Sequence, residues 1–328
     1  MNYEVRDCMD AGSEFCPCHL AESGECLLCS QLRGENFCDC INWKGVCIYQ
    51  EFIWNGTKPK DGRCEIESVL LNKEYVYEDL VLYTISVPHK LAKELNRPGS
   101  FVFLRKPESE YFFSTPISVM EVNVEENRIV LAIEIKGVKT KNLDGIKVGE
   151  DIMLKGPYWN GILGMKNLEK TKDGVAVVIS RGIGQAPIVP VLKKLYSNGN
   201  KIYVIVDKAP YEDMFIKKYV DKYNCEYIET KVIDDKGEIP PELKNILISI
   251  LKNEKVNVIH TSAADIVNYN IMKLVGESVE FSCCNNGKMC CGEGVCGSCS
   301  VKNKYFTIER SCKLQIDPRN ILEGRKLL

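Results

Sequence analysis

Residues 175–187 read VAVVISRGIGQAP, and this stretch decides the fold of the larger half of the chain. Its first six residues form a continuous apolar run, as expected of a strand buried on both faces of a parallel sheet. Gly182 and Gly184 then form a turn that opens a helix. A glycine turn between a strand and a helix leaves backbone N–H groups facing a phosphate, so the stretch predicts one end of a dinucleotide site. A turn that only connects the strand to the helix is the alternative.

Strands and helices alternate from this stretch to residue 282. Apolar runs predict further strands at residues 201–207, 226–233, 256–262 and 279–282, and helices are expected at 185–196, 212–223, 240–252 and 265–275. Repeated β-α units of this length indicate a doubly wound parallel sheet with right-handed crossovers. Such a sheet binds its ligand at the carboxyl ends of its strands.

Asp207 ends the second of these strands. A carboxylate at this position accepts hydrogen bonds from a ribose 2′-hydroxyl and repels a 2′-phosphate, which would favour NADH over NADPH. The neighbouring Lys208 leaves open the alternative of a simple solvated pair at the strand end.

Residues 64–160 have a different pattern. Short β-rich runs recur at residues 81–87, 101–106, 117–124, 128–136 and 150–156, and turns rich in Pro, Gly, Asn and Glu separate them. This spacing is typical of a small antiparallel barrel. The predicted fold class is therefore α/β plus a β-barrel.

The stretch MCCGEGVCGSC at residues 289–299 carries the most specific motif of the chain. Together with a later cysteine it gives the C-x4-C-x2-C…C spacing that holds a 2Fe-2S cluster, on Cys291, Cys296, Cys299 and Cys312. The glycines in the loop permit positive φ angles and close approach of the backbone to the sulfurs. A zinc site is the weaker alternative because only one C-x2-C pair is present. Cys283, Cys284 or Cys290 could replace Cys291 as the first ligand.

Nine of the 17 cysteines fall between residues 8 and 64, where aliphatic residues are few. Such a segment has few apolar side chains to stabilise its fold, and metal binding can supply the missing folding free energy. The candidate ligands are Cys16, Cys18, Cys26 and Cys29, with Cys38, Cys40 and Cys47. Two chemistries stay open: a 4Fe-4S cluster, which we favour because it would extend an electron path, or zinc with His19 as an extra ligand.

Length and charge limit the remaining possibilities. A chain of 328 residues is long enough for two or three domains, since single cores stop growing near roughly 250–300 residues. We expect a Cys-rich metal or Fe-S segment at 1–63, an antiparallel β-barrel at 64–160, a doubly wound nucleotide-binding domain at 161–282 and a cluster region at 283–328. The net charge of -2 argues against nucleic acid as a partner, and no apolar run is long enough to span a membrane. Clustered free cysteines favour a reducing compartment, so the cytoplasm is expected.

The order of barrel, parallel sheet and cysteine loop resembles the ferredoxin-reductase-like flavoproteins. The chain is most similar to the electron-transfer subunit of dihydroorotate dehydrogenase and to its sulfide dehydrogenase and electron-bifurcating NADPH-ferredoxin oxidoreductase relatives. The resemblance covers roughly residues 65–328. It is carried by PGSFVFL, TPIS, the G-x-x-T-x-x-L turn, GPYWNG, GIGQAP and the terminal CGEGVCGSC.

The resemblance implies a binding site for FAD on the barrel. Its residues would be those of the TPIS strand, the turn that faces the flavin diphosphate and the start of GPYWNG: Thr115, Pro116, Ile117, Ser118, Gly137, Thr140 and Gly156. Thr115 stands where the family has an arginine, so a charged contact to the diphosphate is missing unless Arg105 or Lys106 supplies it.

The implied nucleotide site consists of Arg181, Gly182 and Gly184. Here the chain departs from the family, which has glycine in place of Arg181 and a Cys-Gly-Pro turn in place of residues 261–264. Either Arg181 reaches the phosphates of NADH or NADPH, or the pocket is weakened.

The parts together predict an electron-transfer subunit in which a hydride from NAD(P)H reaches FAD and single electrons leave through the 2Fe-2S cluster. We see no site for an organic substrate, so a catalytic oxidoreductase partner subunit is expected in a hetero-oligomer, with ferredoxin as a further candidate partner and anaerobic metabolism as the setting. The alternatives are a conduit or docking subunit that binds no pyridine nucleotide, and a cysteine-based redox regulator without flavin.

Overall fold

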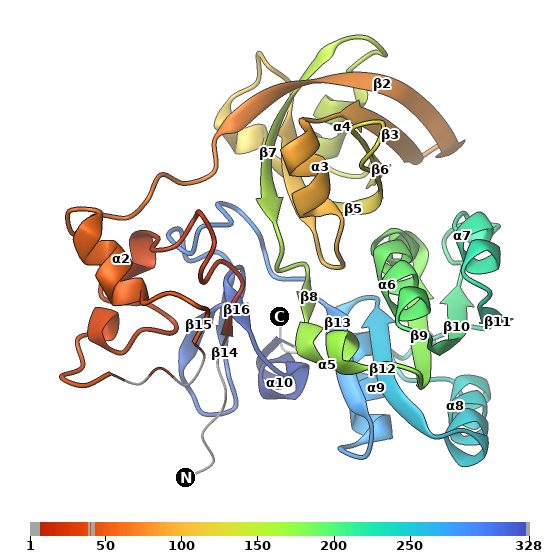
Figure 1. Ribbon diagram of the computed structural model, residues 1–328. Coiled ribbons are helices and arrows are strands. Elements are labelled where there is room, and N and C mark those ends of the chain that lie inside the picture. The colour runs from red at the N-terminus through yellow and green to blue at the C-terminus, as the bar shows by residue number, and fades with distance from the viewer. Residues whose placement is uncertain (1–6, 39, 41–42, 326–328) are drawn as a thin grey trace.

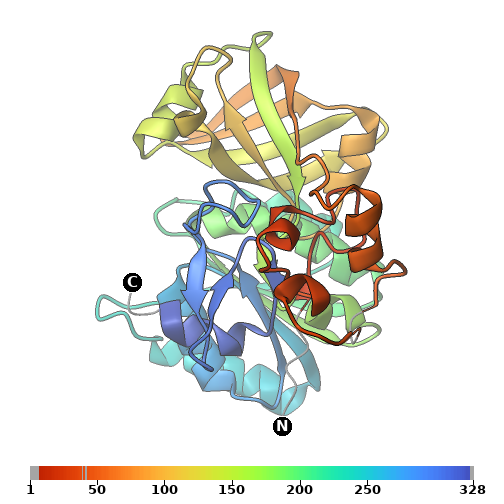
Figure 2. The same cartoon turned by 90° about the vertical axis from the view of Figure 1, so that its left-hand side faces the viewer.

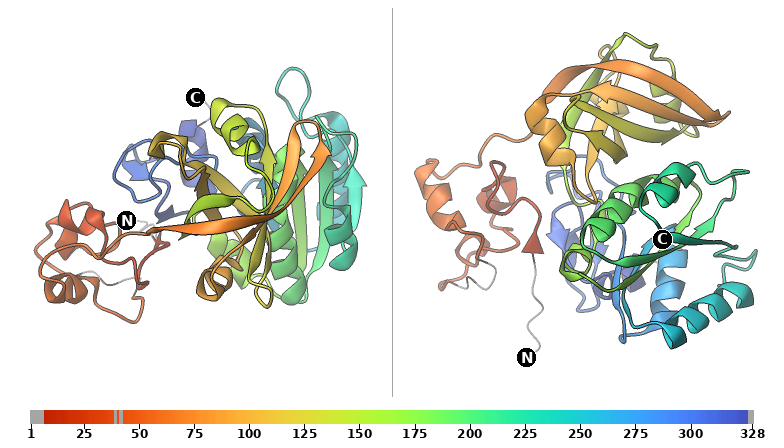
Figure 3. Two further views of the ribbon diagram at one scale, coloured as in Figure 1. Left: turned by 90° about the horizontal axis from the view of Figure 1, so that it is seen from above. Right: turned by 45° about the vertical axis from the view of Figure 1, so that its right-hand side comes forward.

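The computed structural model describes residues 7–38, 40 and 43–325. The ends of the predicted first and last domains, residues 1–6 and 326–328, lie outside the described residues. A barrel sits above an α/β sheet, and the segment before the barrel lies to one side of both (Figure 1). The views in Figures 2 and 3 show that this first segment lies beside the last strands of the chain.

The barrel is closed by six antiparallel strands in the order β2-β3-β6-β5-β4-β7. Their bounds are β2 (Glu65–Tyr77), β3 (Leu80–Ser86), β4 (Phe101–Arg105), β5 (Thr115–Asn123), β6 (Arg128–Glu134) and β7 (Asp151–Tyr158). The connections include α3 (His89–Leu95), η2 (Tyr111–Phe113) and α4 (Val138–Asp144). Apolar side chains such as Leu131 and Ile133 fill the interior. The predicted antiparallel barrel is confirmed.

The longest barrel strand, β2, is absent from the sequence prediction. Most of its residues are half-buried or exposed, so it lacks a continuous apolar run. It pairs with β7 through its first half and with β3 through its second half. A strand that bends between two neighbours presents different faces along its length, and this obscures the period of two on which strand prediction depends.

The second sheet has six strands in the order β11-β10-β9-β12-β13-β8. Five are parallel: β9 (Val175–Arg181), β10 (Lys201–Asp207), β11 (Glu226–Glu229), β12 (Val256–Ser262) and β13 (Glu280–Cys284). The short β8 (Ile162–Leu163) runs antiparallel to β13 at one edge. The predicted parallel sheet is confirmed, with this edge strand added.

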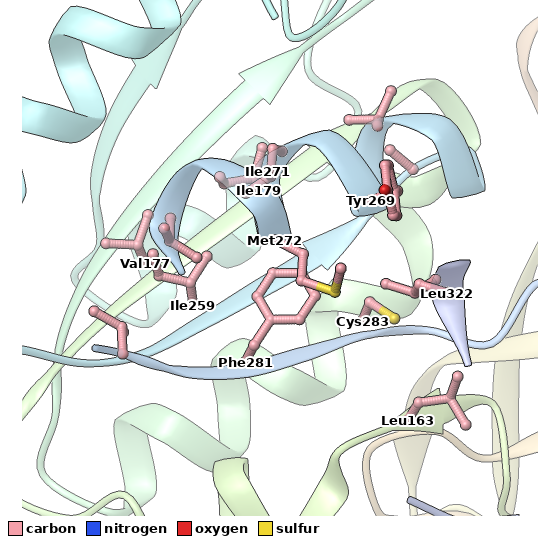
Figure 4. Close-up of a cluster of buried hydrophobic side chains, with 14 of the residues drawn as sticks. Leu163, Val177, Ile179, Ile259, Tyr269, Ile271, Met272, Phe281, Cys283 and Leu322 are labelled. Carbon is pink, nitrogen blue, oxygen red and sulfur yellow. The ribbon is translucent and has the colours of Figure 1, made fainter. Parts of the chain in front are cut away.

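Helices cover both faces of the sheet. On one face α8 (Pro241–Asn253) and α9 (Asp265–Val275) pack on apolar side chains that include Val177, Ile259 and Phe281 (Figure 4). On the other lie α5 (Met165–Lys170), α6 (Gln185–Ser197), which follows η3 (Gly182–Gly184), and α7 (Lys217–Lys222). The helix predicted at 212–223 begins only at Lys217, because turns before it bury Tyr211 and Met214. None of the described helices is long and apolar enough to cross a membrane.

The first segment contains β1 (Asp7–Cys8), α1 (His19–Glu22), η1 (Gln31–Arg33) and α2 (Ile48–Trp54). The chain ends with β14 (Ser300–Lys302), β15 (Ile308–Arg310), β16 (Leu314–Gln315), η4 (Pro318–Asn320) and α10 (Leu322–Arg325). β1 pairs with β16, so both ends of the chain share one small sheet. The first segment has few aliphatic residues, yet Ala21, Leu32 and Phe52 form a small apolar cluster in it.

Four charged side chains join these parts, and we call Asp10, Arg63, Glu293 and Lys313 the buried charge cluster. Arg63 lies 2.8 Å from Asp10 and 3.2 Å from Glu293, and Lys313 lies 2.8 Å from Glu293 and also contacts Asp10. The side chains of Arg63 and Lys313 are each 1% exposed. Burial alone would raise the pKa of Asp10, but the charges of Lys313 and Arg63 hold that pKa below its ordinary value. The cluster therefore holds two positive and two negative charges out of water.

Asp10→Asn should lower the free energy of unfolding by about 3 kcal/mol, because Arg63 and Lys313 would be left buried with one carboxylate between them. Urea denaturation in reducing buffer measures this. Glu14→Gln is the matched control, since Glu14 pairs with Lys90 at 2.7 Å on the exposed surface and should unfold at the wild-type urea concentration. Identical midpoints for both variants would contradict the role given to the cluster.

Candidate functional site

A cavity of about 690 Å³ lies between the barrel and the parallel sheet. Four regions that are far apart in the sequence line it: residues 115–118 with Thr140, the turn that follows β9, residues 262–265, and residues 284–289 ahead of the cysteine loop. The cavity thus brings most of the predicted flavin residues and nucleotide residues together. Among the predicted cofactor residues, Gly137, Gly156, Gly182 and Asp207 do not belong to its lining.

The TPIS residues form the start of β5 in the cavity wall. Thr115, Pro116, Ile117 and Ser118 pair with β4 and all line the cavity. The Thr115 hydroxyl donates to the carbonyl of Phe113 at 2.8 Å. This hydrogen bond fixes the side chain toward η2, which precedes the strand. Gly156 lies in β7, where a β-carbon would press against Val102. Gly156 is therefore needed for close packing between β7 and β4 in the barrel wall.

The turn at residues 136–140 is held by one hydroxyl. Thr140 Oγ1 accepts hydrogen bonds from the N–H groups of Lys136 at 3.1 Å and Gly137 at 3.2 Å. Lys139 in the same turn donates from Nζ to the carbonyl of Ser114 at 3.3 Å, and its ammonium lies over the ring of Phe112. A positive charge is therefore present beside Thr115, on a residue that the sequence analysis did not select.

The cations considered as replacements for the family arginine are engaged elsewhere. Arg105 binds Glu65 at 2.6 Å, and its remaining amino group donates to three backbone carbonyls, including that of Ser109 at 2.8 Å. Lys106 lies 3.7 Å from Glu108. Lys139 is thus the better-placed cation for a diphosphate at this end of the cavity. Counting charges within the G-x-x-T turn, and not only at the TPIS strand, would have found it.

The turn after β9 depends on close backbone approach. Gly182 has a φ angle of +55° and Gly184 lies against the end of β12, where a β-carbon would overlap the carbonyl of Ser262. Gly184 thus allows the turn after β9 to approach the carboxyl end of β12 at the cavity, and Gly182 packs against the carbonyl of Ala209 after β10. Such an approach is the geometry that a backbone-lined phosphate site requires.

Arg181 and Asp207 end adjacent strands and form an ion pair. Arg181 Nε donates to Asp207 Oδ2 at 3.1 Å. The same carboxylate accepts from the backbone N–H groups of Ala209 and Val232, each at 3.1 Å, and its side chain is 5% exposed. Lys208 pairs instead with Glu229 at 3.0 Å. Asp207 would have to exchange these partners to bind a ribose hydroxyl.

The cysteine loop directs amide groups at sulfur. Gly292, Gly294 and Gly297 have positive φ angles, as the loop requires. The N–H of Glu293 lies 3.3 Å from Cys291 Sγ. The thiols interact in two pairs, Cys291 with Cys296 and Cys299 with Cys312. Four thiols with amide donors match the chemistry of a 2Fe-2S ligand set, although the described residues hold no group of three or more ligands already at metal-binding geometry.

The acidity of these thiols follows their surroundings. The hydrogen bond from Cys312 lowers the pKa of Cys299 to about 6. At Cys296, burial alone would raise the pKa of the thiol, but hydrogen bonds from Ser298 lower that pKa to about 7. Burial raises the pKa of Cys291. Thiolates, which are the ligands of iron, are thus favoured at two of the four positions.

The other cysteines near the loop have different surroundings. Cys283 is buried in the apolar core under α9 (Figure 4). Cys284 contacts Asn268 and the carbonyl of Ala263 and lines the cavity. Cys290 is exposed. These positions favour Cys291 as the first ligand, and the ligand set remains a prediction.

Two of the predicted N-terminal ligands lie in a tight turn. The N–H of Cys29 lies 3.4 Å from Cys26 Sγ, a contact typical of C-x2-C turns that bind metal. Cys16, Cys18 and Cys26 lie close enough for their charges to interact. Cys38, Cys40 and Cys47 are exposed. His19 lies beside Glu22 at 3.7 Å. The two sets of cysteines thus differ in exposure: the first four are half-buried and the last three are exposed.

Curated relatives are similar in sequence to about seven tenths of this chain. The electron-transfer subunit of dihydroorotate dehydrogenase B from Clostridium acetobutylicum is 29% identical over 245 residues, which cover 73% of this chain and 92% of the relative. The corresponding subunit from Fusobacterium nucleatum is 27% identical over 226 residues and covers 68% and 84%. No family model matches the chain.

Solved structures agree in fold. An NADH-dependent reduced ferredoxin-NADP oxidoreductase, described in the context of flavin-based electron bifurcation, superimposes with a TM-score of 0.62 at 20% identity and covers 78% of this chain and 88% of its own. A ferredoxin-NADP+ reductase variant from Plasmodium falciparum with 2′P-AMP gives 0.50 at 14% identity, covering 67% and 96%. The ferredoxin-reductase-like fold and the resemblance to electron-transfer subunits are confirmed.

Cys291→Ser should remove about two iron atoms per chain from protein purified without oxygen, because it removes one ligand of the predicted 2Fe-2S cluster. Cys290→Ser is the matched control and should keep the wild-type iron content and visible spectrum. Iron analysis of both variants decides the register of the motif. The opposite result, with iron lost only in Cys290→Ser, would move the first ligand to Cys290.

Proposed function

We propose that this chain, which has the ferredoxin-reductase-like fold, is an electron-transfer subunit that passes electrons between NAD(P)H, FAD and a 2Fe-2S cluster, to or from a partner oxidoreductase subunit. One observation carries the proposal: a single cavity is lined by the TPIS strand, the turn after β9 and the residues that lead into the cysteine loop. Sites for two-electron and one-electron chemistry would then be neighbours.

The residues in the cavity wall suit a flavin and a pyridine nucleotide held against each other. Residues 115–118 and Thr140 would hold FAD on the barrel side, and the turn at Gly182 and Gly184 would hold the nucleotide on the sheet side. When bound, FAD takes up a hydride from the nucleotide and releases electrons one at a time. The protein itself supplies binding, orientation and exclusion of water.

Two stacked aromatic rings connect this cavity to the cysteine loop. Phe101 lines the cavity and stacks on Tyr158 with ring centroids 5.1 Å apart. Gly292 packs directly on the ring of Tyr158, and the Tyr158 hydroxyl donates to the carbonyl of Cys291 at 3.4 Å. A side chain at position 292 would push the loop away. This contact supports short-range electron transfer between a flavin in the cavity and a cluster on the loop.

The N-terminal cysteines would form a second metal centre, as a 4Fe-4S cluster or as zinc. The turn at Cys26 and Cys29 supports metal binding of either kind. Leu20, close to Cys18, packs over Gly294 in the cysteine loop, so the two cysteine regions are neighbours. This position supports an iron-sulfur relay. Stoichiometric zinc with only about two iron atoms per chain would reject the relay.

The name of the similar curated proteins, electron transfer subunit, supports a catalytic partner subunit in a hetero-oligomer. Ferredoxin is a further candidate partner. Neither partner would need an organic substrate site on this chain, and the cytoplasm is the compartment that its free cysteines favour.

The alternative is a conduit that keeps flavin and clusters but binds no pyridine nucleotide. The departures at Arg181 and at residues 261–264 from the family pattern favour it. The visible absorption spectrum of the flavin distinguishes the two functions. Protein purified without oxygen and loaded with FAD should lose its flavin absorbance at about 450 nm on addition of NADH or NADPH. Absorbance that persists with both nucleotides, at full FAD occupancy, would reject the reductase function.

Lys139→Met should weaken FAD binding by about tenfold or more, because it removes the ammonium beside Thr115 that would meet the flavin diphosphate. Fluorescence titration of the apoprotein with FAD gives the dissociation constants. Lys141→Met is the matched control, since Lys141 is an exposed residue of the same helix. Equal affinity of the two variants would show that Lys139 does not contact FAD.

A further inference from the structure

The positive charge at the nucleotide end of the cavity comes from one side chain. Among the described residues that line the cavity, Arg181 is the only cation. The two carboxylates in the lining have other partners: Glu134 contacts Tyr211 and Lys136, each at 2.8 Å, and Asp265 accepts from Asn286 at 2.9 Å. A dinucleotide brings at least two negative charges into this space. A cation that can meet them must therefore be Arg181 or lie outside the lining.

Asp207 fixes the direction of the Arg181 side chain. The ion pair uses only Nε of the guanidinium, at 3.1 Å from Asp207 Oδ2. Asp207 is in turn held by the backbone N–H groups of Ala209 and Val232, so it is a rigid anchor. Neither terminal amino group of Arg181 has a hydrogen-bond partner among the residues that the structure describes. The side chain is 41% exposed although its anchor is buried.

This arrangement suits a planar guanidinium that binds a phosphate. Arginine has five N–H donors in a fixed fork, and one of them here holds the side chain in place while four remain for a ligand. Hydrogen bonds from a charged donor to phosphate are among the strongest in proteins. Because the carboxylate is already matched by the guanidinium, Asp207 would no longer repel an anion at the strand end.

We propose that Arg181 is the phosphate-binding residue of the nucleotide site, anchored by Asp207 and donating from its terminal amino groups to a phosphate of the pyridine dinucleotide. The inference rests on the proposed function. It replaces the expectation that Asp207 selects NADH, because Asp207 acts through Arg181 and is a positioning residue. Two phosphates offer this chemistry: the diphosphate that NADH and NADPH share, and the 2′-phosphate that only NADPH carries.

Calorimetric titration of the FAD-loaded protein tests the proposal. The probes are ADP-ribose, which carries only the diphosphate, and 2′-phospho-ADP-ribose, which carries both groups. Arg181→Gln should weaken binding by about tenfold or more, since a charge-assisted contact is lost. Equal weakening for both probes assigns the diphosphate, and weakening for 2′-phospho-ADP-ribose alone assigns the 2′-phosphate. Either outcome supports the proposal.

Two further variants keep the result interpretable. Lys208→Gln is the matched control, because Lys208 is the neighbouring cation but pairs with Glu229 and does not line the cavity. Arg181→Gln with Asp207→Asn removes the pair without leaving an unpaired buried carboxylate, and it should bind as weakly as Arg181→Gln. Affinities of both Arg181 variants equal to that of Lys208→Gln would overturn the proposal. Loss of FAD in place of nucleotide affinity would also overturn it.

Failure of the inference and failure of the proposed function are distinguishable. If the wild-type protein binds neither probe, the nucleotide-dependent function fails and the inference fails with it. If the wild-type protein binds a probe and Arg181→Gln binds it equally well, only the inference fails.

Discussion

The buried charge cluster is the constraint on which the arrangement of the other parts depends. Asp10 comes from the first segment, Arg63 from the entry to the barrel, Glu293 from within the cysteine loop, and Lys313 from the position after Cys312. Each charge loses much of its hydration and is compensated mainly by its partners in the cluster, so separating the segments would leave buried charges unpaired, which is strongly unfavourable. The cysteine loop is thereby fixed against the barrel wall, where Gly292 meets Tyr158.

The cations near the cavity stand at other positions than in the family pattern. The family arginine is absent at Thr115, yet the ammonium of Lys139 lies beside the same strand on the adjacent turn. At the other end, Arg181 replaces a glycine and Asp207 holds it in position. Both substitutions put a cation where a phosphate group is expected. In the proposed function, Lys139 and Arg181 would supply the positive charge that the phosphates of FAD and a pyridine nucleotide require.

Much of the fold could be predicted because local pattern and final burial agree. The apolar run at residues 175–180 is buried in β9, and the alternation of strands and helices after it matches the observed sheet. β2 could not be predicted, because its faces change as it bends between two neighbours. Within the candidate site, only residues that belong to contiguous sequence motifs could be predicted. The pairs that join distant residues, such as Arg63 with Glu293, leave no pattern in the sequence that spacing can reveal.

In the proposed function, electrons from NAD(P)H reach the cysteine loop through a flavin in the cavity. Rapid mixing of NADPH or NADH with the oxygen-free protein, before and after removal of FAD, tests it by following the electron paramagnetic resonance signal expected of a reduced 2Fe-2S cluster. We predict that the signal appears in the FAD-loaded protein and is lost without FAD. Equal reduction of the cluster in the flavin-free protein would contradict the account.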